Sequence, residues 1–200
     1  MQMDKINVGS LVDAKMTRGR EQIQSFDPRG EFYAEHWRDG KLLSRQKFPN
    51  GITDEGKAKI FDLYFDEDDT TVPQDAYIGL INWPGSTPTL LAADTYTTHA
   101  GWTEFTAYKV AADGTKRAEW DADASTGAGT VSISNASPAT FDFDANGDVY
   151  GIFVVTGLTA EIELQSNVTA GNILWAHGGL ATEIAVVSGD QLKITYTVNA

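Results

Sequence analysis

The sequence of 200 residues contains no cysteine. This absence excludes disulfide bonds, thiolate zinc sites, iron–sulfur ligation and cysteine nucleophiles. Long hydrophobic runs are also missing, because no stretch approaches the roughly 20 apolar residues that a membrane-spanning helix requires. The first seven residues, Met-Gln-Met-Asp-Lys-Ile-Asn, lack the apolar core of an export signal, so we expect synthesis and folding in a cytoplasm.

Basic residues are scarce relative to acidic ones. The chain has 15 Lys and Arg against 28 Asp and Glu, for a formal net charge of −13 at pH 7. Such a chain lacks the basic surface that neutralises nucleic-acid phosphates, and an anionic membrane repels it, so we expect neither as a partner. The cations concentrate before residue 60, and the region after it is strongly acidic. With 42% hydrophobic and 22% charged residues, the composition is typical of a globular protein with a packed core.

Short apolar runs between turn residues predict a mainly β protein. Eight runs recur at fairly even spacing after residue 69, which favours an antiparallel sandwich or jelly-roll-like domain. Near the N-terminus, two further segments flank Arg38-Asp39-Gly40-Lys41, where Asp-Gly favours a two-residue turn. We therefore expect an N-terminal β-hairpin as well. The eight runs are 76–81, 103–110, 129–133, 139–144, 149–155, 172–176, 184–187 and 191–198.

One helix is expected over residues 53–65. Thr53 is a favourable N-cap, and the carboxylates that follow it suit the first turn. The spacing of the apolar residues predicts that one face docks on a sheet, although Gly56 interrupts the first turn. We expect two parts in the chain, an arm and hairpin over residues 1–49 and a helix plus β-sandwich over residues 50–200. The predicted docking residues are Ala58, Phe61, Tyr64 and Phe65.

One segment has the oxygen-ligand spacing of a calcium loop. Asp142, Asp144, Asn146 and Asp148 surround a central glycine, but loop position twelve, which needs a bidentate Glu, falls on Phe153. Asn146-Gly147 is also a strong hairpin-turn dipeptide, and we favour that interpretation. The sequence therefore predicts no metal site and no cofactor. The alternative is a calcium site formed by these four residues. We interpret the acidic run 66–69 as a solvated loop.

No catalytic motif is evident. Asp94 and His99 are the closest acid–histidine pair, yet no nucleophile-elbow sequence accompanies them, so we favour a polar loop. Phosphate-binding glycine motifs do not occur either. The five tryptophans either stack on sugar rings, with Trp83 and Trp102 as candidates, or fill the core or an interface, which we favour.

The order of several segments resembles a family of tailed-bacteriophage virion proteins. The ending Gly189 to Tyr196, which reads Gly-Asp-Gln-Leu-Lys-Ile-Thr-Tyr, is similar to a recurrent ending in that family. One departure is 142–148, which is more acidic than the Ser/Thr-rich hairpin expected there and leaves room for a cation. The resemblance covers about residues 30–200, through 50–56, 61–65, 77–81, 91–95, 99–105, 134–141, 149–154, 171–176 and 187–198.

This resemblance implies a non-enzymatic structural protein located in the virion and made in the host cytoplasm. The implied role is decoration or stabilisation of the capsid, with the major capsid protein or other virion proteins as partners and a dimer or trimer as the assembly. A receptor- or glycan-binding module of a fibre or tail is the alternative, and a polysaccharide hydrolase is the third possibility. The positive charge near the N-terminus predicts the interface with an acidic capsid surface. The interface candidates are Arg18, Arg20, Trp37, Arg45 and Lys47.

Overall fold

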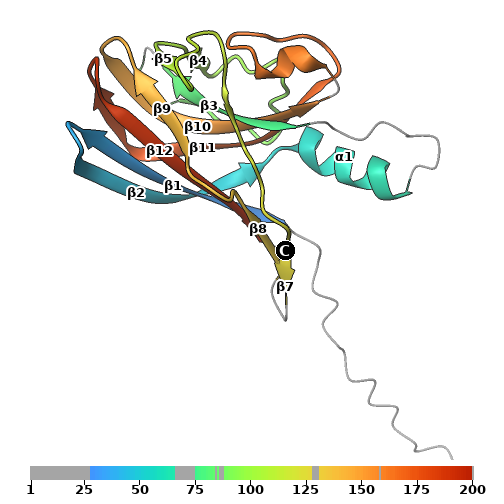
Figure 1. The fold of residues 1–200 in the computed structure, drawn as a ribbon. Coiled ribbons are helices and arrows are strands. Elements are labelled where there is room, and N and C mark those ends of the chain that lie inside the picture. The colour runs from blue at the N-terminus through green and yellow to red at the C-terminus, as the bar shows by residue number, and fades with distance from the viewer. Residues whose placement is uncertain are drawn as a thin grey trace, which may run out of the picture.

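In the computed structural model, strands in two facing layers make up most of the molecule (Figure 1). The structure describes residues 28–65, 75–83, 85, 88–127, 131–157 and 159–199. The strands pair antiparallel in a single sheet that folds over and is nearly closed into a barrel. One α-helix of the described residues projects from one end. The predicted mainly β, sandwich-like fold with one helix and an N-terminal hairpin is therefore confirmed.

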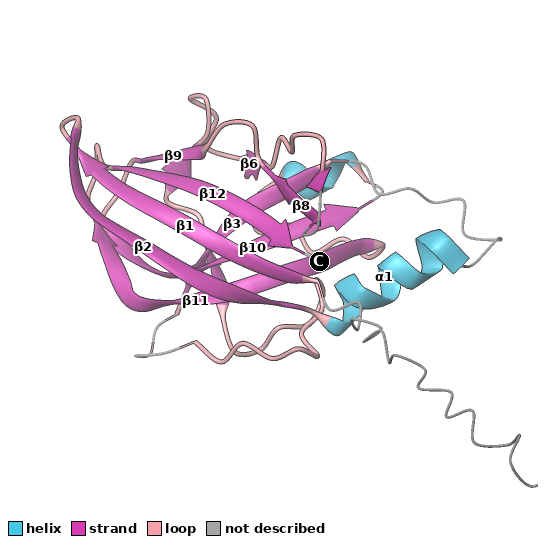
Figure 2. Ribbon diagram, turned by 90° about the horizontal axis from the view of Figure 1, so that it is seen from below, coloured by secondary structure: helices cyan, strands magenta, loops and turns pink. Residues whose placement is uncertain are grey.

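The first layer is built around the N-terminal hairpin and the C-terminal strand. Strand β1 lies between β2 and β12, and the other edge of β12 pairs with β8 at one end and β9 at the other. Figure 2 shows β2, β1 and β12 side by side. The strands of this layer are β1 (Arg29–Arg38), β2 (Lys41–Ile52), β5 (Tyr108–Lys109), β7 (Thr126–Gly127), β8 (Val131–Ser134), β9 (Ala139–Phe143) and β12 (Gln191–Asn199).

The second layer has β10 at its centre, between β3 and β11. The two layers join where Gly51 and Ile52 of β2 pair with His177 and Ala176 of β11. The predicted runs 172–176 and 184–187 form one strand, because residues 180–183 bulge opposite Tyr150 without ending the ladder. The strands of this layer are β3 (Ala76–Asn82), β4 (Thr103–Phe105), β6 (Ala118–Glu119), β10 (Gly147–Gly157) and β11 (Asn172–Val186).

Hydrophobic side chains are packed on both sides of the second layer. The larger cluster fills the space between the layers and includes Phe32, Phe141 and Tyr196. The smaller cluster lies under the loops that precede β4 and under the 3₁₀ helix η2 (Ala160–Glu163), and it includes Trp102. Because β10 contributes alternate side chains to the two clusters, its residues 151–155 are all buried. A continuous apolar run is the sequence expected for such a strand.

The hairpin turn between β1 and β2 has the predicted conformation. Asp39 and Gly40 have φ angles of 49° and 72°, so both central residues are in the left-handed region. This region is what a two-residue type I′ turn requires, and Asp-Gly adopts it at low cost. The prediction of the N-terminal hairpin is therefore correct in its turn as well as in its strands.

Helix α1 (Asp54–Phe65) begins where the sequence predicted, but it contacts the sheet differently. The Thr53 hydroxyl oxygen accepts a hydrogen bond from Gly56 N at 3.0 Å, which confirms the N-cap. The predicted docking face is wrong at Ala58 and Phe61, both exposed, whereas Gly56 in the first turn is buried. Only the start of the helix packs on β11, and the rest projects outward (Figure 2). The side chains of Tyr64 and Phe65 and the run 66–69 lie outside the described residues.

The predicted hairpin at Asn146-Gly147 is wrong. Strand β9 pairs with β12 in the first layer, whereas β10 pairs with β3 and β11 in the second, so the segment is a connection between layers. Gly147 is needed for packing, since a Cβ atom there would lie 2.4 Å from the ring of Phe105. A dipeptide signal for a turn cannot show which sheet the next strand joins.

Candidate functional site

The outer face of β1 carries the aromatic and charged side chains that are most suited to contact another molecule. Along β1, Phe32, Ala34 and His36 point into the core, so Tyr33, Glu35 and Trp37 point outward. The register places Lys47 and Arg45 of β2 opposite Tyr33 and Glu35. Opposite residues of an antiparallel pair share one face of the sheet. We call this surface, with Tyr33, Glu35, Trp37, Arg45, Lys47 and Lys193, the docking face.

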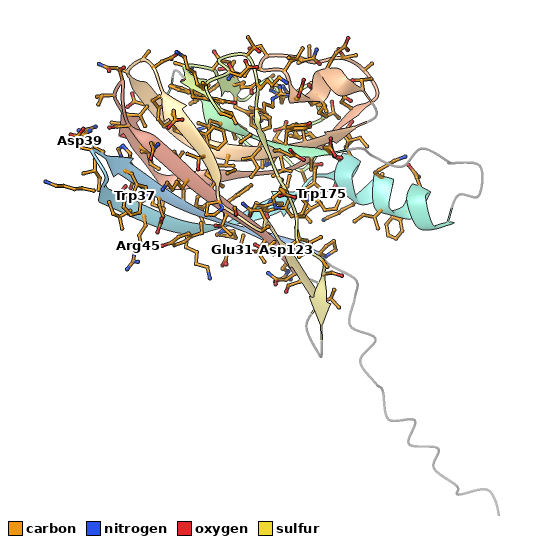
Figure 3. The ribbon with its side chains drawn as sticks, in the orientation of Figure 1. Glu31, Trp37, Asp39, Arg45, Asp123 and Trp175 are labelled. Carbon is orange, nitrogen blue, oxygen red and sulfur yellow. The ribbon has the colours of Figure 1, made fainter. Side chains whose placement is uncertain are left out.

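Hydrogen bonds fix the aromatic side chains of the docking face. The Glu35 carboxylate accepts a bond from the Tyr33 hydroxyl at 3.0 Å and another from Trp37 Nε1 at 3.2 Å. The Lys193 ammonium lies 5.0 Å from the centre of the Trp37 ring, a distance typical of a cation–π contact. Glu31, Trp37 and Arg45 point away from the second layer in Figure 3. The two aromatic side chains are therefore held in place before any partner binds.

Three predicted interface residues, Trp37, Arg45 and Lys47, come together on this face. Arg18 and Arg20 lie outside the described residues. The period-two alternation of β1 is the signal that brings these positions to one side of the sheet. Tyr33 and Lys193 were missed, although the same alternation in β1 and in β12 could have identified them.

A small cavity of about 220 Å³ lies on the far side of the second layer. Its walls are mostly apolar and come from Phe153 and Val155 of β10, Leu174 of β11, Trp102, and Val168 after η2. Arg117 and Glu104 also line the cavity, and their side chains are almost completely buried. The cavity therefore combines an apolar interior with one buried ion pair.

Arg117 has little capacity left to bind a ligand. Its Nε and Nη2 donate to the two oxygens of Glu104 at 2.9 and 2.8 Å, and its Nη1 donates to the Tyr96 hydroxyl and to the Ile162 carbonyl. Burial opposes the charge of Arg117, but the bonds and attraction to Glu104 outweigh it and raise the pKa of the guanidinium. A guanidinium with its donors already bound to protein stabilises the loops that it joins.

The aromatic rings near the cavity do not present open faces for sugar stacking. The His99 ring stacks on Trp102 with centroids 3.9 Å apart, and Phe153 lies 5.1 Å from Trp102 in a tilted arrangement. Trp102 is only 3% exposed, and Trp83 packs against the same cluster. Trp120 and Trp175 pack against the larger cluster. Trp37 thus differs from the other four tryptophans in facing outward from the sheet.

Asp94 and His99, the closest acid–histidine pair in the sequence, bind different groups and not each other. Asp94 accepts hydrogen bonds from Trp102 Nε1 and from Leu91 N, and it lies 3.4 Å from His177 Nε2. His99 Nδ1 is instead 3.2 Å from the carbonyl oxygen of Trp102. Asp94 therefore holds the loop that precedes β4 against β11. This role agrees with the interpretation of the segment as a polar loop.

Three of the four residues of the predicted calcium alternative contact different protein groups, and the fourth is exposed. Asp142 accepts from Gln191, Asp144 lies 3.7 Å from the ammonium of Lys109, and Asn146 accepts from Ser188 N. Asp148 is exposed on β10. Within the described part of the chain, no group of three or more His, Asp or Glu is arranged to hold a metal ion.

No helix in the described ranges is both long and apolar enough to cross a membrane. Comparison of the chain with models of protein families, with curated proteins and with solved structures finds no match.

Proposed function

We propose that this protein is a non-enzymatic structural component of a tailed-bacteriophage virion that docks on the capsid through the docking face. The observation that carries the proposal is the group of Trp37, Tyr33 and Arg45 on the outside of the first layer, in which Glu35 holds the two aromatic side chains. Trp, Tyr and Arg are the side chains most enriched at the energetic centres of protein interfaces. The segments that resemble phage virion proteins, which include β12, give the proposal its biological setting.

The charge distribution supports one orientation on the particle. Eleven of the 15 Lys and Arg precede residue 61, whereas 19 of the 28 Asp and Glu follow it. A basic face binds best to an acidic partner surface, because complementary potentials favour encounter and suppress wrong partners. The acidic remainder then faces solvent, where like charge keeps particles apart.

The location is tested by quantitative mass spectrometry of purified virions. We expect tens to hundreds of copies per particle for a decoration protein on a capsid lattice, and a handful for a tail component. If purified virions contain none of the protein, the proposal is wrong.

The docking face is tested by adding protein back to particles that lack it. We expect Trp37→Ala and Arg45→Glu to reduce particle binding, since both remove groups from the centre of the face. Lys109→Glu is the matched control, because Lys109 is a half-exposed cation of β5, and β9 and β12 separate β5 from β1 and the docking face. Equal binding by Arg45→Glu and Lys109→Glu would show that another surface docks.

A glycan-binding module is the second candidate, and the spacing of Tyr33 and Trp37 favours it. Residues four apart in a strand lie about 13 Å apart on one face, so two sugar rings of one chain could stack on them. Glycan-array binding that Trp37→Ala abolishes, together with a handful of copies per virion, would establish this function instead. Hydrolysis of a polysaccharide has weaker support. Glu104 is the one carboxylate among the described residues lining the cavity, and catalysis would require two.

A further inference from the structure

The tip of the β1–β2 hairpin carries two adjacent exposed leucines. Leu42 is 40% exposed and lies opposite Trp37, and Leu43 is 50% exposed at the position where the ladder shifts register. Lys41 and Arg45 flank them in sequence. Elsewhere in the described chain, the exposed large apolar side chains stand singly on separate elements, so the tip is distinctive. An apolar centre with a basic rim is typical of a protein contact.

The cavity on the second layer could receive such a side chain. An apolar cavity of about 150 Å³ is large enough to bind benzene, so a cavity of about 220 Å³ accommodates a leucine side chain. Val168 lines this cavity and is 54% exposed, which places one apolar wall at the surface. The charged groups that line the cavity, Arg117 and Glu104, are bound to each other and to the backbone of Ser166 and Asn167, so an incoming side chain does not have to pair with them.

Charge complementarity identifies the occupant as a second copy of this chain. The hairpin tip is basic, whereas the part of the chain that forms the cavity is strongly acidic. Its few cations are engaged within the molecule: Lys109 with Asp144, Lys116 with Glu163, and Arg117 with Glu104. Glu161 is exposed and accepts a hydrogen bond from Thr169, next to Val168. A basic tip is therefore attracted to the cavity side of a neighbour.

We propose that copies of this protein associate head to tail, with Leu42 and Leu43 of one copy seated at the cavity of the next. The hairpin tip lies at the left end of Figure 1 and the orange helix η2, beside the cavity, at the upper right, so the tip is far from the cavity of its own copy. A contact between two different surfaces forms rings when the rotation closes and chains when it does not. The inference goes beyond the capsid proposal, because it concerns contacts between copies and requires no capsid.

Sedimentation velocity of the purified chain over a concentration series tests the contact. Wild-type protein is expected to associate, and Leu43→Asp at the tip and Val168→Arg at the cavity are each expected to weaken association by about tenfold or more. Val131→Asp is the matched control, since Val131 is 53% exposed on β8. Leu42→Ser provides a second tip variant, and circular dichroism shows whether each variant is folded.

Mixing the two defective variants distinguishes this contact from a symmetric one. The Leu43→Asp copy retains an intact cavity and the Val168→Arg copy an intact tip, so an equimolar mixture is expected to form a dimer that does not grow. The proposal is overturned if wild-type protein stays monomeric at about 1 mM, at the weak end of the affinity scale. It is also overturned if the folded variants associate like wild type, or if the mixture forms no dimer. These results do not depend on whether virions contain the protein.

Discussion

The carboxylate of Asp190 binds the guanidinium of Arg38 through two hydrogen bonds, of 2.6 and 2.8 Å, although the residues are 152 positions apart. Asp190 also accepts a bond from His36 Nε2 at 2.7 Å and one from Val187 N. It thereby ties the turn between β11 and β12 to the end of β1. Replacing Asp190 with Asn leaves Arg38 and His36 without their carboxylate. We expect Asp190→Asn to lower the unfolding free energy by about 2–3 kcal/mol in urea denaturation at pH 7.

The same variant should reveal a pH dependence. The hydrogen bonds from Arg38, opposed by burial, lower the pKa of the Asp190 carboxyl. A group whose folded pKa is depressed stabilises the native state fully above its unfolded pKa, near 4, and loses that contribution as pH falls toward the folded value. The difference between wild type and Asp190→Asn should therefore shrink below about pH 4. A difference that stays constant between pH 7 and pH 2.5 would contradict this assignment.

The Arg117–Glu104 pair provides a second stability prediction. Arg117→Met leaves the buried Glu104 carboxylate without its cation, so we expect a loss of about 3–5 kcal/mol in unfolding free energy. Glu104→Gln in the Arg117→Met background should cost much less than it does in wild type, since the uncompensated charge is already the main penalty. A double-mutant cycle in urea measures this coupling. Additive effects of the two substitutions would show that the pair is not coupled.

At Gly56, we expect a stability change opposite to the one that helix propensity predicts. Ala is favoured over Gly inside a helix by about 1 kcal/mol, so propensity alone predicts that Gly56→Ala stabilises. A Cβ atom at Gly56, however, would lie 2.7 Å from the carbonyl oxygen of Trp175, which is backbone and cannot move aside. We expect Gly56→Ala to lower the unfolding free energy by about 1–2 kcal/mol.

Ala58→Gly is the matched control, because Ala58 is exposed on the same helix. It should cost about 1 kcal/mol through propensity alone. Destabilisation by both substitutions is the expected pattern. Stabilisation by Gly56→Ala would mean that the first turn of α1 is not held against β11.

Local signals predicted the elements whose causes are local. Asp39-Gly40 predicted the hairpin because both residues tolerate positive φ, and Thr53 predicted the start of α1 because its hydroxyl caps the helix. Asn146-Gly147 misled because the choice between layers depends on β3, β11 and β12, which are distant in sequence. The docking of α1 was mispredicted for the same reason, since its contact with Trp175 spans more than 100 residues.

The candidate site was predictable only in part. Alternation along β1 is sufficient to place Trp37 beside Arg45 and Lys47 once the hairpin is known. Asp94 contacts Trp102 and His177 and not His99. Predicting these contacts would have required knowledge of how the loop before β4 crosses β11. The cavity was not predicted, because its walls come from β10, β11 and separate loops that no local pattern brings together.

Replacement by alanine should change the unfolding free energy at Trp102 but hardly at Trp37. Trp102 is 3% exposed, packs on Phe153 and donates to Asp94, so Trp102→Ala should cost about 3–5 kcal/mol of unfolding free energy. Trp37 lies half-buried on the docking face, where its contacts with Glu35 and Lys193 are each worth less than about 1 kcal/mol. Trp37→Ala should therefore unfold near the wild-type denaturant concentration.

This contrast decides how any binding defect is interpreted. Lost binding in Trp102→Ala reports a damaged fold, whereas lost binding in Trp37→Ala at unchanged stability reports the docking face itself. We expect Trp37→Ala to bind particles at least about tenfold more weakly, since interface tryptophans commonly contribute 2 kcal/mol or more. Urea denaturation and particle binding measured on the same preparations separate the two effects. Wild-type particle binding by a stable Trp37→Ala variant would place the contact with the capsid elsewhere on the molecule.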